Sequence, residues 1–358
     1  MGITIKRRKT RRIMVGTVPV GGDAPIAVQS MTNTETSDVA ATVAQIQRLT
    51  EAGCEIIRVA VPDQKAALAI KNIKKEIQIP LIADIHFDHR LAIAAAKSGA
   101  DALRINPGNI GGKKRLRRVV EVAAEHGISL RVGVNSGSIE KVLLRKFGGP
   151  TPQAMVESAL NHLAFLEDLD FHEVKVSLKS SSVRDTIEAY RLFSQKADYP
   201  LHLGVTEAGT LLPGLIKSAI GIGTLLMGGI GDTLRVSLTS DPLDEVRAAY
   251  EILRALDLRH RGPEIISCPT CGRCEIDLFR LVHEVEKALI NISASPKVAI
   301  MGCVVNGPGE AKEADIGIAG GRGQGILFKK GKVVKKIPED QLANALIEEI
   351  KAMVDDNG

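Results

Sequence analysis

The segment EIIRVAVPDQKAALAIKNIKKEIQIPLIADI, residues 55–85, contains two short apolar runs separated by a longer amphipathic stretch. The outer runs, EIIRVAV and PLIADI, have the length of buried strands. Between them, Asp63 precedes apolar residues that recur every three or four positions, which predicts a helix with a capped start. A strand, a helix and a second strand in this order form the repeating unit of a parallel α/β fold.

The same unit repeats along most of the chain. Helices are predicted after Asp38, Asp63, Thr151 and Asp241, each beginning with a capping side chain. Eight strand–helix units in about 230 residues predict a (β/α)8 TIM barrel. A doubly wound sheet is the alternative, but no Gly-x-Gly-x-x-Gly follows the first strand. The predicted strands begin at Ile26, Glu55, Pro80, Ala102, Ser129, Glu173, Pro200 and Thr233.

Regions outside these units predict a second, smaller domain. The chain up to Val28 reads as a hairpin with a turn at Gly21-Gly22 that closes the barrel floor, and residues 259–267 read as a linker. The predicted domains are therefore a barrel over residues 1–262 and a small α+β domain over residues 263–358. The smaller domain is expected to contain a helix in EIDLFRLVHEVEKALINI, a strand in PKVAIMGC, two short strands around Gly331 and a final helix from Pro338.

Composition excludes several classes of protein. The 358 residues carry a net charge of +5, include 3% aromatic residues and contain no Trp, which argues against a nucleic-acid-binding protein. No signal peptide follows the basic start of the chain. The most apolar segment, residues 211–231, is interrupted by Pro213, Lys217 and several glycines, so it does not predict a membrane span. We expect a cytoplasmic protein.

Polar side chains gather at the carboxyl ends of the predicted strands, where barrels place their active sites. Five of them are cations on different strands, and burying like charges together is unfavourable unless an anion neutralises them. A phosphate or diphosphate ligand would supply that anion. The strand-end residues are Arg58, Asp84, His86, Arg104, Asn106, Arg131, Asn135, Lys179, Glu207, Arg235 and Ser237.

Four of the five cysteines lie in the smaller domain. Cys268, Cys271 and Cys274 form a C-x2-C-x2-C run, and Cys303 follows in MGCVVNGPGEA. The second C-x2-C pair of a zinc ribbon is absent, so the spacing favours an iron-sulfur cluster over zinc. Spacing alone selects these four thiolates, but Glu310 follows Cys303 closely and the fourth ligand stays open. Cys54 stands apart and is predicted to be an inert buried thiol.

Together these motifs resemble the bacterial 4-hydroxy-3-methylbut-2-enyl diphosphate synthase (IspG/GcpE) family, in its two-domain form. The resemblance covers nearly the whole chain, and the two cysteine motifs are its most specific part. The motifs that carry it are ADIHFD, LRINPGNIG, RVGVNSGS, VSLKSS, GVTEAG, GDTLRVSLT, SCPTCGR and GCVVNGPGEA.

The resemblance implies a [4Fe-4S] cluster held by Cys268, Cys271, Cys303 and Glu310, with Cys274 outside the ligand set. It implies reductive ring opening and dehydroxylation of 2-C-methyl-D-erythritol 2,4-cyclodiphosphate in the methylerythritol phosphate pathway. Glu207, Asp84, His86 and the exchangeable ligand Glu310 are then the catalytic residues, with Glu207 the expected proton donor. Diphosphate contacts carry over to Arg58, Arg104, Asn106, Arg131, Asn135, Lys179, Arg235 and Ser237.

The same resemblance implies partners. Flavodoxin or ferredoxin would deliver the electrons, and the enzyme would be a head-to-tail homodimer. Two rival functions remain: a zinc-stabilised barrel that binds an anionic metabolite or transfers a one-carbon unit, and a zinc-ribbon protein that binds nucleic acid. Iron and acid-labile sulfide distinguish the reductase from both.

Overall fold

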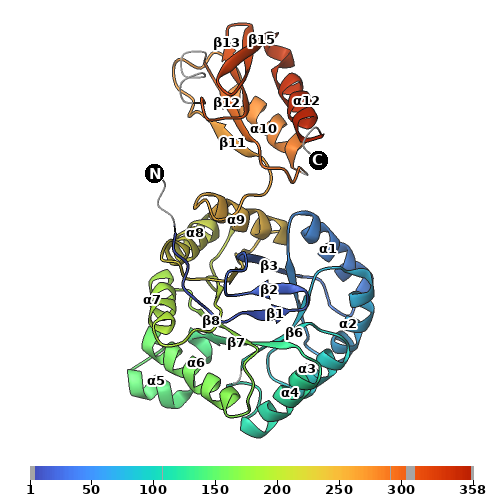
Figure 1. Cartoon of the computed structure of the whole chain (residues 1–358), viewed down its shortest axis with the longest axis vertical. Helices are drawn as coiled ribbons and strands as arrows, with labels where there is room; N and C mark the ends of the chain where they lie inside the picture. Colours follow the sequence, from blue (N-terminus) through green and yellow to red (C-terminus); the bar gives the residue numbers. More distant parts are fainter. Residues whose placement is uncertain (1–4, 107, 291, 304–310, 356–358) are drawn as a thin grey trace. The chain divides into compact units, whose positions relative to one another are not determined.

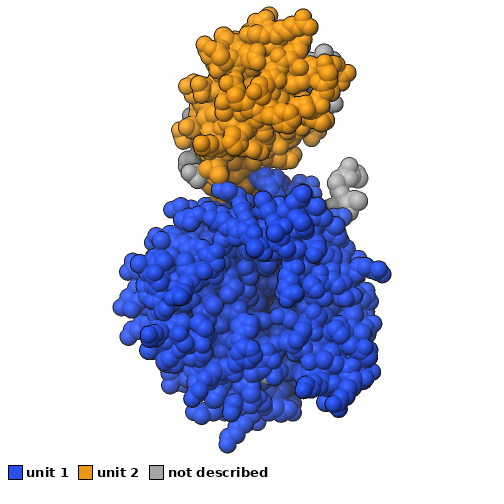
Figure 2. All heavy atoms as spheres, turned by 180° about the vertical axis from the view of Figure 1, so that it is seen from behind, with its two compact units in different colours: residues 1–259 blue, residues 260–358 orange. Residues whose placement is uncertain are grey.

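The computed structural model describes residues 5–106, 108–290, 292–303 and 311–355. The chain divides into two compact units, Met1–Arg259 and His260–Gly358 (Figure 2). This division falls three residues before the domain boundary proposed from the sequence, within the segment that was expected to be a linker.

The first unit is a closed ring of parallel strands. Its sheet pairs in the order β8-β7-β6-β5-β4-β3-β10-β9, and a parallel bridge between Val176 and Leu201 joins β8 to β9. All eight predicted strands and the TIM barrel are confirmed. The strands are β3 (Ala27–Met31), β4 (Ile56–Ala60), β5 (Leu81–Ile85), β6 (Ala102–Ile105), β7 (Ser129–Asn135), β8 (Val174–Lys179), β9 (His202–Leu203) and β10 (Thr233–Leu234).

Helices surround this ring (Figure 1). The predicted caps Asp38, Asp63, Thr151 and Asp241 each accept a hydrogen bond from a backbone N–H of the following helix. No helix among the described residues is both long and apolar enough to cross a membrane. The helices are α1 (Val39–Glu51), α2 (Gln64–Glu76), α3 (His89–Lys97), α4 (Lys113–Glu125), α5 (Lys141–Phe147), α6 (Pro152–Glu167), α7 (Val183–Ser194), α8 (Leu211–Met227) and α9 (Pro242–Arg254); α5 was not predicted.

The N-terminal hairpin closes one end of the barrel, as predicted (Figure 1). Its antiparallel strands β1 (Ile13–Val15) and β2 (Val18–Val20) are joined at Gly16-Thr17, not at the predicted Gly21-Gly22, which forms a separate turn after β2. Gly16 has φ +55°, which favours glycine in such a tight turn. The hairpin's apolar side chains pack against the first inward-facing residues of the barrel strands: Ala27, Ile56, Ile82 and Ala102.

The described residues of the second unit form a five-stranded sheet with two α-helices. Its strands β11 (Glu264–Ser267), β12 (Lys297–Met301), β13 (Ile316–Gly321), β14 (Gln324–Lys329) and β15 (Lys332–Pro338) pair in chain order, and the first three are parallel. Helices α10 (Leu278–Leu289) and α12 (Leu342–Asp355) supply much of its apolar core. The predicted α10, β12, β14, β15 and α12 are confirmed.

Two strands of this sheet were not predicted. The linker prediction was wrong for β11, because a four-residue strand is too short to show periodicity in the sequence. β13 contains three glycines, which are depleted in strands. A Cβ on Gly320 would lie 2.4 Å from Ile276 Cδ1, so close packing requires glycine at this position.

Candidate active site

Inside the barrel, the inward-facing residues of five neighbouring strands, β3 to β7, change from apolar or small to polar or charged along the strand. Successive inward positions are two residues apart. Near the hairpin the inward side chains are apolar or small, and one step further they are charged or polar. The pairs are Ala27 and Gln29, Ile56 and Arg58, Ile82 and Asp84, Ala102 and Arg104, and Ser129 and Arg131.

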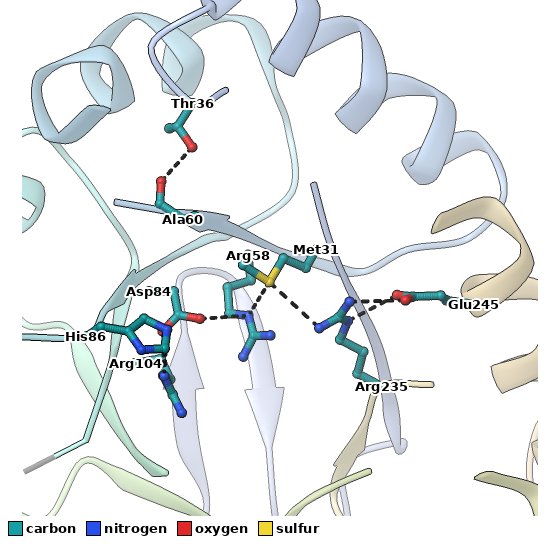
Figure 3. A network of polar contacts seen from close by, with 9 residues as sticks. All are labelled: Met31, Thr36, Arg58, Ala60, Asp84, His86, Arg104, Arg235 and Glu245. Carbon is teal, nitrogen blue, oxygen red and sulfur yellow. Dashed lines mark hydrogen bonds and ion pairs between the residues drawn. The ribbon is translucent and has the colours of Figure 1, made fainter. Parts of the chain in front are cut away.

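Asp84 is the centre of one group of contacts (Figure 3). Its carboxylate lies 3.0 Å from Arg104 Nη1 and 3.5 Å from Arg58 Nε, and all three side chains are buried. Burial alone would raise the pKa of Asp84, but Arg58, Arg104 and Arg131 outweigh it and hold the pKa at about 2. Asp84 therefore remains a carboxylate near neutral pH and fixes the two guanidinium groups.

A second carboxylate holds Arg235. Glu245 of α9, which is 3% exposed, binds Arg235 Nε and Nη2 at 3.1 Å each in a bidentate pair. Met31 Sδ lies 3.1 Å from Arg58 Nε and 3.7 Å from Arg235 Nη1, so the two groups are neighbours (Figure 3). The strand-end cations are thus held in place by the protein itself.

Other cations in the barrel lack such a partner. Among the described residues, Arg131 Nε and Nη1 and Lys175 Nζ are buried without a hydrogen-bond partner. Burial and the neighbouring Arg131 and Arg58 lower the pKa of Lys175 to about 7, and burial followed by Arg131 lowers the pKa of Lys179 well below its usual value. Buried polar groups rarely stay unsatisfied, so these cations favour an anionic ligand.

Two glycines leave room for the long side chains. A Cβ on Gly133 of β7 would lie 2.9 Å from Arg104 Nε, and one on Gly204 would lie 2.4 Å from Lys179 Nζ. Gly204 also has φ +159°, which few other residues adopt. Any larger residue at these positions would displace a cation from the interior.

The remaining predicted residues lie around the same strand ends with fewer contacts. His86 is exposed, but its Nε2 lies 3.2 Å from Arg104 Nη1. Asn106 is buried and accepts a hydrogen bond from the Gly108 N–H, and Asn135 pairs in register with Lys179. Glu207 is exposed with φ +51°, and Ser237 is half-buried beyond β10. Among the predicted site residues that the structure describes, side-chain hydrogen bonds and ion pairs join Arg58, Asp84, His86 and Arg104.

Sequence reasoning missed several interior residues. Lys175 and Gln29 lie on strands that were predicted, at positions an even number of residues from Lys179 and Met31, so strand alternation could have found them. His202, whose Nδ1 lies 2.8 Å from Thr233 Oγ1, is another buried polar residue on a predicted strand that was missed. Glu245 gave no such signal, because only the packing of α9 on the barrel makes it an inward-facing group.

The predicted ligand cysteines lie at one edge of the second unit. β11 and β12 are parallel, with Ser267 opposite Ile300, so Cys268 and Gly302-Cys303 follow the same edge of the sheet. The Gly302 N–H donates a hydrogen bond to Cys268 Sγ at 3.3 Å, and a Cβ on Gly302 would lie 2.6 Å from Cys274 Sγ. Three cysteines therefore surround Gly302.

This edge fits an iron-sulfur cluster. Thiolates with backbone N–H donors to sulfur are the usual ligands and tuning contacts of such clusters. Cys271 is exposed, and the Cys274 N–H binds the Cys271 carbonyl at 2.9 Å, which keeps this loop compact. Within the described residues, no three Cys, His, Asp or Glu side chains lie close enough together to hold a metal ion. The predicted ligand Glu310 lies outside those residues.

Cys54 is confirmed as a buried thiol in the barrel. It is 2% exposed, and burial raises its pKa to about 12, so it is neither a nucleophile nor a metal ligand near neutral pH.

Solved structures reproduce the barrel. A dihydropteroate synthase from Stenotrophomonas maltophilia matches with a TM-score of 0.51 and 13% identity, covering 69% of this chain and 98% of that one. A second, from Xanthomonas albilineans, matches with a TM-score of 0.50 and the same identity, covering 69% and 98%. At this identity the likeness concerns the fold alone.

Sequence comparisons extend over both units. A protein of Lawsonia intracellularis named 4-hydroxy-3-methylbut-2-en-1-yl diphosphate synthase (flavodoxin) is 62% identical, covering 97% of each chain. One of the same name from Caldanaerobacter subterraneus is 62% identical over 98% of this chain and 99% of that one. The family model described as the GcpE TIM-barrel domain matches residues 10–250, and that of the GcpE protein C-terminal domain matches residues 264–352. The chain belongs to the GcpE family.

Proposed function

We propose that the chain is a 4-hydroxy-3-methylbut-2-en-1-yl diphosphate synthase of the methylerythritol phosphate pathway. It is an oxidoreductase that opens the ring of 2-C-methyl-D-erythritol 2,4-cyclodiphosphate and removes one hydroxyl as water, using two electrons. Relatives of that name match along nearly the full chain. The observation that carries the proposal is the barrel interior, where Arg131 Nε and Nη1 and Lys175 Nζ are buried without a hydrogen-bond partner among the described residues.

The barrel binds and orients the diphosphate. Arg58, Arg104 and Arg235 are fixed by Asp84 and Glu245, so their positions are set before the ligand arrives. Preorganised donors of this kind lose little entropy on binding and stabilise charge that develops during the reaction. The full proposed set of diphosphate contacts is Arg58, Arg104, Asn106, Arg131, Asn135, Lys179, Arg235 and Ser237.

Proton transfer is assigned to a residue nearer the reacting carbons. Asp84, with its pKa held at about 2, has no proton to give near neutral pH and therefore orients Arg58 and Arg104. His86 lies beside Arg104 and is exposed enough to contact a ligand. Glu207 is the proposed donor: it sits in the left-handed region at φ +51°, a conformation that few non-glycine residues adopt and that often marks functional sites.

The second unit is proposed to hold a [4Fe-4S] cluster through Cys268, Cys271, Cys303 and Glu310. When bound, such a cluster supplies electrons and, where its ligand is a carboxylate, an iron open to Lewis-acid chemistry. The strand ends that converge at Gly302 support Cys268 and Cys303 as ligands, whereas the choice of Cys271 and Glu310 over Cys274 rests on the family resemblance. Flavodoxin or ferredoxin is the proposed electron donor.

Anaerobic purification tests the proposal directly. The protein should contain iron and acid-labile sulfide in equal amounts and convert the cyclic diphosphate when reduced. Cys303→Ser should lose the cluster while Cys274→Ser keeps it. Stoichiometric zinc without sulfide would reject the cluster, and the reverse result for the two serine variants would return Cys274 to the ligand set.

A homodimer is part of the proposal. Exposed apolar residues of α8 support self-association, because Leu212, Ile216 and Ile220 are spaced by one helical turn and are 51–68% exposed. Sedimentation of the wild type and of Ile216→Glu tests this point, and a wild-type monomer would reject it. The head-to-tail arrangement rests on the family resemblance.

A further inference from the structure

Lys175 is the most deeply buried unpartnered amine among the described residues. It faces the barrel interior from β8, is 0% exposed, and its Nζ has no hydrogen-bond partner there. Strand register places Lys175 opposite Arg131, and Arg131 opposite Arg104. Lys179 follows on the same side of the same strand, nearer the strand end.

The charges that face Lys175 do not balance. Asp84 is already engaged by Arg58 and Arg104, and Glu245 by Arg235. His202 is fully buried, with its Nε2 unpartnered. The charged and titratable groups around the interior are Arg58 on β4, Asp84 on β5, Arg104 on β6, Arg131 on β7, Lys179 on β8, His202 on β9, Arg235 after β10, Glu245 on α9 and Tyr190 on α7.

A lysine can relieve this excess where an arginine cannot. A guanidinium stays protonated in proteins, whereas a buried ammonium can lose its proton. We propose that, above neutral pH, Lys175 is a neutral amine in the empty barrel and accepts a proton from solvent when a diphosphate binds above it. This inference rests on the proposed function, because it takes the diphosphate site to be the strand ends around Arg131.

The reaction itself would make use of such a proton. Ring opening breaks a C–O bond and leaves the electron pair on a phosphate oxygen, which adds a negative charge to the bound diphosphate. A protonated Lys175 offsets that charge. In the empty barrel, burial and then Arg131 and Arg58 lower the pKa of Lys175 to about 7; a bound anion acts in the opposite direction.

Calorimetry of ligand binding tests the proposal. Anaerobic holoenzyme without reductant is titrated with the cyclic diphosphate in two buffers of different ionisation enthalpy, at pH 6 and pH 8. Each phosphate of the cyclic ligand has one ester and one anhydride linkage and therefore a single, strongly acidic hydroxyl, so neither phosphate titrates in this range. The wild type should take up close to one proton per site at pH 8 and much less at pH 6.

Two variants and a control locate the proton. Lys175→Met should lose most of the uptake at pH 8 and bind roughly tenfold more weakly. Lys175→Arg, which keeps its charge permanently, should lose the uptake and bind with a pH-independent affinity. Lys196→Met removes an exposed lysine after α7 and should leave both quantities unchanged.

The outcomes separate this inference from the proposed function. If both Lys175 variants take up as many protons as the wild type, Lys179 or His202 accepts the proton and the inference is wrong. If a wild type that contains its cluster does not bind the cyclic diphosphate, the proposed function fails instead. Inorganic diphosphate then serves as the probe, and the uptake difference between wild type and Lys175→Met still tests Lys175.

Discussion

The two ends of the barrel interior use the same strands for opposite purposes. At the floor, Ile56, Ile82 and Ala102 pack on the N-terminal hairpin as an apolar layer. Two residues further along, the same strands present Arg58, Asp84 and Arg104. Two residues along each strand therefore separate a layer that stabilises the fold from a layer that is proposed to bind the diphosphate. Substitutions at the two levels should consequently fail in different ways.

A charge at the floor should have the largest effect. Ile82→Asp places a carboxylate where the described neighbours are apolar, so it should cost more than about 4 kcal/mol and prevent folding. Soluble yield and circular dichroism measure this. Ile82→Val, which leaves only a small cavity, should cost about 1 kcal/mol and fold normally. A folded, soluble Ile82→Asp protein would contradict the distinction between the two levels.

Removing the Asp84 carboxylate should destabilise the protein strongly, but less than Ile82→Asp does. Asp84→Ala leaves Arg58 and Arg104 without their shared partner and should lower the free energy of unfolding by about 3–5 kcal/mol. The contribution of Asp84 is present above its unfolded pKa and is lost as the pH falls from about 4 to about 2. Urea unfolding at pH 7 measures the loss of stability in Asp84→Ala. The control is Glu157→Gln, in an exposed pair with Lys146, which should change the free energy of unfolding by less than about 1 kcal/mol. Equal losses in the two variants would count against the buried network.

Removing an unpaired cation should affect binding and not stability. Arg131→Met should weaken binding of the cyclic diphosphate by roughly a hundredfold and leave the free energy of unfolding unchanged or higher. Arg235→Met should also weaken binding, but it leaves Glu245 unpaired and should destabilise the protein. Arg118→Met, on the exposed surface of α4, is the control for both measurements. Unchanged affinity in Arg131→Met would remove this residue from the site.

The smallest effect should appear as a pH dependence. The folded state lowers the pKa of Lys175 to about 7 from 10.5, so between these values the unfolded chain binds more protons. The Lys175 contribution to stability therefore rises with pH across this range. Between pH 7 and pH 8 the wild type should gain on the order of 1 kcal/mol relative to Lys175→Met. Parallel pH profiles of the two proteins would show that Lys175 does not titrate as proposed.

Sequence patterns were sufficient for the barrel but only partly for its site. Short apolar runs between capped helices predicted every barrel strand, and Arg58, Arg104 and Arg131 were predicted at the strand ends. They did not reveal Glu245, which reads as one helix residue among many until α9 packs on the barrel. In the second unit, β11 and β13 were missed. A short or glycine-rich segment becomes a strand because it pairs with a neighbouring strand, and its own sequence gives little sign of this. The choice of Glu310 over Cys274 came from family resemblance, since spacing alone selects Cys274.

The hairpin β1–β2 has a consequence for the rate of binding. By filling the floor with apolar side chains, it leaves a poorly polarisable medium below the interior cations. Field lines from the barrel arginines, Arg58, Arg104 and Arg131, are then directed toward the strand carboxyl ends, where water is present. An approaching anion is attracted before it makes any contact, and its association rate should fall as salt is added. A small N-terminal hairpin, far from any reacting atom, thus helps to determine how fast an anionic ligand is captured.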